Sequence, residues 1–128
     1  MPARSAYDYA IVRVVPRVER GEFVNAGAIV HCRARAFLGA RVVFDRGRLA
    51  ALFPAADLDA IRAHLEAIPV VATGGAPAGA IGALSTTERF HWLVAPRSTI
   101  VQTSPVHVGL CDEPNAALDD LMRRYVTL

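Results

Sequence analysis

Residues 9–44 read YAIVRVVPRVERGEFVNAGAIVHCRARAFLGARVVF, and this stretch decides the predicted fold. It contains three runs rich in Val, Ile and Phe, at residues 9–15, 23–32 and 37–44, separated by short polar links. β-branched and aromatic residues favour the pleated surface of a strand, and Gly21 supplies a turn residue between the first two runs. The stretch therefore predicts an antiparallel meander.

The rest of the chain adds helices and two short strands. Apolar residues at helical spacing predict a helix that begins at Asp57 and stops at Pro69. The pair Ser85 and Glu88 is typical of a capping box before a second helix, in which Phe90 and Trp92 are expected as core anchors. The expected elements are a turn of helix at 48–52, helices at 57–68, 86–94 and 115–126, an exposed Gly-rich loop at 72–82, and strands at 99–103 and 106–110. We therefore predict a single α+β domain over residues 1–128, an antiparallel β-meander with additional C-terminal strands packed against three helices.

Composition excludes several classes of function. The 128 residues carry a net charge of +2, and all fourteen positive residues are arginine. The absence of lysine excludes a Schiff-base lysine and a P-loop lysine. A charge of +2 is too small to predict nucleic-acid binding. Because the chain has two distant cysteines, no signal-peptide core and no long apolar run, we expect a cytoplasmic protein without membrane contact.

Strand alternation divides the predicted meander into two faces. The even-numbered residues of all three strands are apolar and form a packed face. The odd-numbered residues form a mixed face, on which the polar residues include Arg13, Asn25 and Arg41. A hairpin turn near Arg20 places Arg13 opposite Gly27. A glycine opposite a guanidinium leaves room for a ligand to approach the backbone and the arginine together.

This arrangement predicts an anion site. Arginine offers a planar fork that suits carboxylate or phosphate, and Arg97 is followed by two hydroxyl side chains. The alternative is that the arginines pair with Asp8, Glu19, Glu22 or Asp45 and solvate an exposed sheet face. The candidate ligand-binding residues are Arg13, Asn25, Arg41, Arg97, Ser98, Thr99 and His107.

Cysteine and histidine residues offer a weaker signal. His107, Cys111 and Asp112 include the residue types of a thiol nucleophile or a zinc site, as do His31 and Cys32. Adjacent strand residues point to opposite faces, so the second pair does not converge on one ion. A free thiol is more often buried as a small apolar side chain. We expect no metal site and no cofactor, and no catalytic residue is assigned.

Several segments resemble the bacterial family known as domain of unknown function 3037. The matching segments are residues 7–10, 12–20, 22–25, 88–90, 95–99, 104–107 and 109–111. The resemblance spans nearly the whole chain and brings no assigned activity. It implies a small stand-alone bacterial protein, often encoded beside a kinase-like protein that resembles the HipA toxin.

Two functional hypotheses follow. In the first, the chain is a non-catalytic binding or regulatory module associated with a HipA-like kinase, which it contacts through the mixed face and residues 97–99. In the second, it is a small phosphoryl- or nucleotide-handling enzyme in which Arg13, Arg41 and Arg97 hold phosphate and His107 supplies acid/base catalysis. A homodimer that buries the mixed face is a further expectation.

Overall fold

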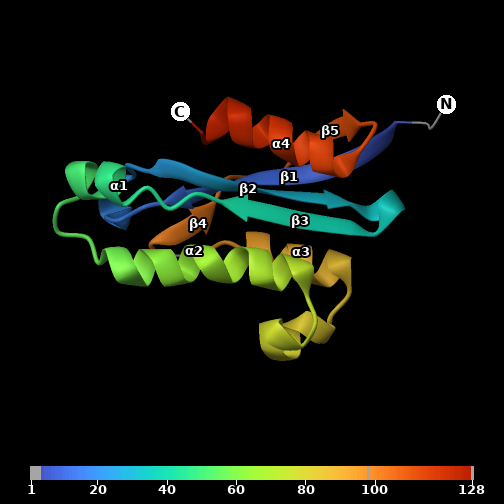
Figure 1. Cartoon of the computed structure of the whole chain (residues 1–128), viewed down its shortest axis with the longest axis horizontal. Coiled ribbons are helices and arrows are strands. Elements are labelled where there is room, and N and C mark those ends of the chain that lie inside the picture. The colour runs from blue at the N-terminus through green and yellow to red at the C-terminus, as the bar shows by residue number, and fades with distance from the viewer. Residues whose placement is uncertain (1–3, 98, 128) are drawn as a thin grey trace.

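A five-stranded antiparallel sheet lies between two layers of helices in the computed structural model, which describes residues 4–97 and 99–127 (Figure 1). The strands run in the order β3-β2-β1-β4, and β5 pairs with the first half of β1, whereas β4 pairs with its last residues. The α+β prediction is confirmed. The strands are β1 Ser5–Val14, β2 Val24–Cys32, β3 Phe37–Val42, β4 Val101–Thr103 and β5 His107–Cys111. The α-helices are α1 Arg46–Leu52, α2 Leu58–Thr73, α3 Thr86–Val94 and α4 Pro114–Tyr125, and short 3-10 segments occupy Val18–Arg20, Arg33–Arg35 and Ala76–Ala83.

Helices cover both faces of the sheet, with α2 and α3 on one side and α4 on the other (Figure 1). On the first side, Val12 and Ile29 of the sheet pack in one cluster with Leu65 of α2. On the second side, Ile11 packs with Leu121 of α4. The predicted mixed face is therefore largely covered by α4, although Arg41 at its margin remains exposed. The surface on which a homodimer was expected is occupied by the chain's own helix.

The pairing of β1 with β2 differs from the predicted register. Val12 pairs with Gly27, and Arg13 pairs with Asn25, so the predicted pairing of Arg13 with Gly27 is wrong. Ala26 is the extra residue of a β-bulge between these pairs. The strand prediction assumed unbroken alternation, which a bulge interrupts.

The bulge divides the even-numbered residues of β2 between the two faces. Val24 and Ala26 belong to the cluster under α2, whereas Ala28 and Val30 belong to the cluster under α4. Both faces of β2 are consequently apolar and both are buried. This is why one strand supports helices on two sides.

The expected space beside Gly27 is filled by β3. A Cβ atom at Gly27 would collide with the carbonyl oxygen of Arg41 and lie 2.9 Å from Cγ1 of Val42. The glycine therefore permits close approach of two strands. It leaves no open approach for a ligand on this side.

Helix α2 continues past Pro69 to Thr73, so the predicted stop at Pro69 is wrong. Its last turn is held by Arg89 of α3, whose guanidinium donates to the carbonyl oxygens of Val71 at 3.0 Å and Ala72 at 3.3 Å. Both acceptor residues are buried in the core. Tertiary contacts thus maintain the helix beyond a residue that usually ends one.

The start of α3 agrees with the sequence. Ser85 Oγ accepts a hydrogen bond from the Glu88 amide at 3.1 Å, and Glu88 Oε1 accepts one from the Ser85 amide at 3.3 Å, which confirms the capping box.

The predicted Gly-rich loop is partly wrong, because residues 76–83 form 3-10 turns interrupted at Gly79. Within the described residues, no helix has the length and apolar character needed to cross a membrane.

Candidate functional site

A cavity of about 350 Å³ lies between α2, the end of α3 and β4. Small and aliphatic side chains of α2 form one wall, and residues from α3 to β4 form the other. A volume of this order and a largely apolar lining are typical of ligand pockets. We call it the α2–β4 cavity, and it is lined by Ala63, His64, Ala67, Ile68, Val71, Trp92, Leu93, Ala95, Arg97, Thr99, Val101, Gln102 and Thr103.

Trp92 and Arg97 form a stacked pair in this lining. Trp92 is 40% exposed, so its prediction as a core anchor is wrong, whereas Phe90 is buried as predicted. The guanidinium carbon of Arg97 lies 4.3 Å from the centre of the Trp92 ring, and Arg97 Nη2 donates to the Trp92 carbonyl oxygen at 2.5 Å. No ion pair joins Arg97 to a carboxylate in the part of the chain that the structure describes. Its side chain is therefore fixed in place while its charge is not neutralised by a neighbouring acid.

The other polar groups of the cavity are hydroxyl, amide and imidazole groups. Thr99 Oγ1 donates to the carbonyl oxygen of Val101 at 2.8 Å, and Gln102 Nε2 donates to the carbonyl oxygen of Thr99 at 2.7 Å. His64 adds an imidazole from α2, and the lining includes no Asp or Glu. The predicted Ser98 lies outside the described residues. The cavity thus combines apolar walls with an arginine and no opposing carboxylate.

Arg13 and Asn25 meet at a second place, near the C-terminal end of α4. They are register partners, and Asn25 Nδ2 donates to the carbonyl oxygen of Tyr125 at 3.1 Å. The guanidinium carbon of Arg13 lies 4.1 Å from the centre of the Phe23 ring. Arg13 Nε and Asn25 Oδ1 are buried and have no hydrogen-bond partner among the residues that the structure describes. The prediction that these two residues share a face therefore agrees with the structure.

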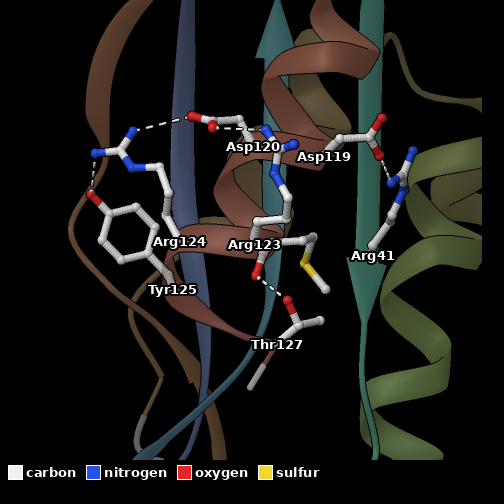
Figure 2. A network of polar contacts seen from close by, with 8 residues as sticks. Arg41, Asp119, Asp120, Arg123, Arg124, Tyr125 and Thr127 are labelled. Atoms are coloured by element: carbon white, nitrogen blue, oxygen red, sulfur yellow. Dashed lines mark hydrogen bonds and ion pairs between the residues drawn. The ribbon is translucent and has the colours of Figure 1, made fainter.

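Arg41 is held by the helix that covers this face. It forms an ion pair with Asp119 of α4 (Figure 2). The adjacent Asp120 forms ion pairs with Arg123 and Arg124. The hydrogen bond from Arg124, and to a smaller extent that from Arg123, lowers the pKa of the Asp120 carboxyl group. The interpretation that arginines pair with carboxylates thus describes Arg41, although its partner lies in α4.

His107 lies apart from the other candidates. It is exposed on β5, and its ring centre is 5.4 Å from that of Tyr9. The α2–β4 cavity contains neither His107 nor Arg13 nor Arg41 in its lining. The structure therefore brings Arg97 and Thr99 to one cavity, brings Arg13 and Asn25 together elsewhere, and leaves Arg41 and His107 at two further positions.

The cysteines are free and buried. Burial raises the pKa of the Cys111 thiol, with a smaller contribution from Cys32. A raised pKa keeps a thiol protonated at neutral pH, which disfavours nucleophilic attack. In residues 4–97 and 99–127, no three His, Cys, Asp or Glu side chains gather in a way that could hold a metal ion.

A buried histidine anchors α3 to the sheet. His31 is 3% exposed, and its Nδ1 lies 3.3 Å from Asp8 Oδ2 while its Nε2 lies 3.1 Å from Thr87 Oγ1. Its ring stacks on Phe90 with centres 4.8 Å apart. These contacts join β1, β2 and α3. They fix the helix that carries Trp92.

Sequence reasoning missed four polar or aromatic members of the cavity, which are His64, Trp92, Gln102 and Thr103. For Trp92 a signal was available, because Phe90 and Leu93 lie on the buried stripe of α3 and position 92 falls outside that stripe. No comparable signal identifies His64 or Gln102. Their shared cavity depends on elements far apart in the sequence.

A protein-family model matches residues 9–126 of the chain, and the family is described as a protein of unknown function, DUF3037. The matched range includes every segment that lines the α2–β4 cavity. No curated protein and no solved structure matches the chain.

Proposed function

Since the chain belongs to the DUF3037 family, whose function is unknown, we propose that it is a non-catalytic binding module whose protein partner docks in the α2–β4 cavity. The observation that carries this proposal is the exposed Trp92 with the guanidinium of Arg97 over its ring, in the lining of a largely apolar cavity. Tryptophan and arginine are the residue types that most often dominate the energy of protein interfaces. Their fixed geometry also reduces the entropy lost on binding.

The lining indicates the chemistry of the segment that binds. Aliphatic residues of α2 and α3 suit an apolar side chain, whose burial supplies binding energy. Arg97, which has no carboxylate partner among the described residues, suits an acidic group on the same segment. The proposed ligand is therefore a peptide segment that presents an apolar side chain next to a carboxylate.

The proposed partner is a HipA-like kinase. The support for this identity is the resemblance to a family whose members are often encoded beside such kinases. The cavity accommodates one or a few side chains of such a partner, and the surrounding surface completes the contact. In this role the chain regulates or positions the kinase and performs no chemistry of its own.

The enzymatic alternative requires Arg13, Arg41, Arg97 and His107 around one phosphate group. Arg97 lines the α2–β4 cavity, Arg41 is paired with Asp119, and His107 is on β5. Phosphoryl chemistry needs its charged groups within contact distance of the same oxygens. The dispersed positions of these residues support the binding interpretation.

The proposal is tested by co-expressing the chain with the kinase encoded beside it. We expect the two proteins to elute together in size-exclusion chromatography, and we expect Trp92→Ala or Arg97→Ala to raise the dissociation constant about 30-fold, a typical loss for a dominant interface residue. Because Trp92 is 40% exposed and Arg97 lies on the surface, both variants are expected to fold. Isothermal titration calorimetry measures the change.

Arg123→Ala is the matched control. This arginine lies on α4, on the opposite side of the sheet, and its removal also subtracts one positive charge. We expect its dissociation constant to equal that of the wild type. Separate elution of the two wild-type proteins, or equal weakening by Arg97→Ala and Arg123→Ala, would contradict the proposal. Turnover of a phosphorylated substrate that is lost in His107→Ala would favour the enzymatic alternative.

A further inference from the structure

The outer edge of β5 is an apolar strand edge. In the described structure β5 pairs with β1 on one side, and no strand pairs with its other side. Val108 is 71% exposed and Leu110 is 65% exposed, and Val106 before the strand is 44% exposed. Single exposed apolar residues are ordinary on a protein surface. Alternate residues of a strand point to the same side of the sheet, so Val108 and Leu110 form an exposed apolar pair on one face of β5, next to its outer edge.

Backbone hydrogen-bonding groups of β5 also point outward. The Ser104 amide donates to the Ile11 carbonyl oxygen at 2.8 Å, so the odd-numbered residues of β1 direct their polar groups toward this edge. These residues pair with the odd-numbered residues of β5. The amide and carbonyl groups of Val108 and Leu110 consequently face away from β1. No backbone group in residues 4–97 and 99–127 pairs with them, so another strand can do so.

The edge carries none of the charged side chains that commonly prevent such pairing. Proteins commonly protect an exposed strand edge with charged residues, and residues 105–111 contain no Arg, Asp or Glu. The next carboxylate, Asp112, is paired with Arg4 at 3.6 Å. At the opposite edge of the sheet, Arg41 of β3 is charged and held by Asp119. The β3 edge of the sheet therefore carries a charged side chain, whereas the β5 edge carries none.

We propose that β5 pairs antiparallel with β5 of a second copy of this chain, around a two-fold axis at Gly109. In this register Val108 of each copy lies opposite Leu110 of the other, and each such pair exchanges both of its hydrogen bonds. Neither strand carries a formal charge, so the pairing brings no like charges together. The two five-stranded sheets join into one continuous sheet.

Gly109 suits the position on the axis. It lies opposite its own copy, where the two backbones approach most closely in an antiparallel pair. On its own chain the ring of Tyr7 lies over it, and a Cβ atom would approach that ring to 2.7 Å. The absence of a side chain therefore serves both the pairing with β1 and the approach of the second copy. The contact is isologous, as in most homodimers.

The expected dimer is weak. Two strands of five residues bury less than the roughly 1,200 Å² at which stable interfaces begin, so we expect a concentration-dependent equilibrium. Sedimentation velocity of the full chain from about 1 μM to about 1 mM should show a dimer fraction that rises with concentration. This measurement requires no partner protein. It is therefore independent of the proposed kinase complex.

Val108→Lys tests the proposed register. The substitution places a charge opposite an apolar residue in both halves of the interface, and we expect at least about a 10-fold increase in the dimer dissociation constant. Val18→Lys is the matched control, since Val18 is also an exposed valine, at 46%, and lies in a turn away from the edge. Leu110→Lys is a second variant if Val108→Lys does not fold.

The outcomes are distinct. A concentration-dependent wild-type dimer that Val108→Lys weakens and Val18→Lys leaves unchanged supports the proposal. A wild-type chain that stays monomeric throughout the concentration range overturns the proposal. A dimer that Val108→Lys and the control Val18→Lys weaken equally also overturns it. A dimer that persists in both Val108→Lys and Leu110→Lys also overturns it, because the copies then meet through another surface.

Discussion

At the scale of single residues, Arg89 shows how a buried charge stabilises this fold. The side chain is 8% exposed, and it donates hydrogen bonds to the carbonyl oxygens of Val71 at 3.0 Å, Leu84 at 2.5 Å and Ala72 at 3.3 Å. A cation at the C-terminal end of a helix is also favoured by the helix dipole. Arg89 therefore ties α3 to the last turn of α2. Its partners are fixed by packing, and its position in the sequence did not reveal this role.

We expect Arg89→Met to lower the free energy of unfolding by about 3 kcal/mol, because it leaves buried carbonyl oxygens without donors. Urea denaturation followed by circular dichroism measures the change. Arg62→Met is the control, since Arg62 forms an exposed ion pair with Glu66 and its loss should leave the free energy of unfolding nearly unchanged. Equal effects of the two substitutions would show that Arg89 does not hold α2.

At the scale of elements, the alternation of apolar residues and the turn residues predicted the meander, whereas no sequence pattern predicted the β-bulge at Ala26. The strands, the capping box of α3 and the terminal helix have strong local patterns, so their existence was predictable. The bulge at Ala26 has no pattern of its own, because alanine and glycine fit either face of a strand. It decided which side chains of β2 face each helical layer, and it moved Arg13 from Gly27 to Asn25.

The Gly27→Ala variant tests the close approach of β2 and β3. Its methyl group would meet the carbonyl oxygen of Arg41 and lie close to Cγ1 of Val42, so we expect a loss of about 2 kcal/mol in the free energy of unfolding. Gly47→Ala in α1 is the matched control. A Cβ atom at position 47 would lie 3.8 Å from Oδ1 of Asp45, its nearest neighbour, and alanine favours a helix. Chemical denaturation compares the two variants. A Gly27→Ala protein as stable as Gly47→Ala would contradict the inferred contact.

At the scale of the whole molecule, buried titratable groups link stability to pH. Burial raises the pKa of Tyr7, and burial also raises the pKa of Cys111. From about pH 7.5, one unit below the ordinary pKa of an unfolded thiol, the folded state retains more protons than the unfolded state. The stability present at neutral pH is therefore lost as the pH rises through this range and through the higher range in which Tyr7 titrates.

We expect the urea midpoint of the wild-type chain to fall between about pH 7.5 and about pH 10.5, and to fall less in the double variant Tyr7→Phe, Cys111→Ala. Circular dichroism at each pH provides the midpoint. A wild-type midpoint that is constant across this range would contradict the assignment, as would equal slopes for the wild type and the double variant.

The sequence by itself determined the fold class, the order of the elements and the exclusion of lysine chemistry, because these depend on local periodicity, capping and composition. It also placed Arg97 and Thr99 together, since they are two residues apart. Only the tertiary structure decided that α4 covers the mixed face and that the guanidinium of Arg97 lies over the ring of Trp92. The α2–β4 cavity also became visible only in the tertiary structure, because α2 and β4 are separated by residues 74–100 and meet only through packing. Local interactions select elements, whereas burial of apolar surface between distant elements selects which side chains meet.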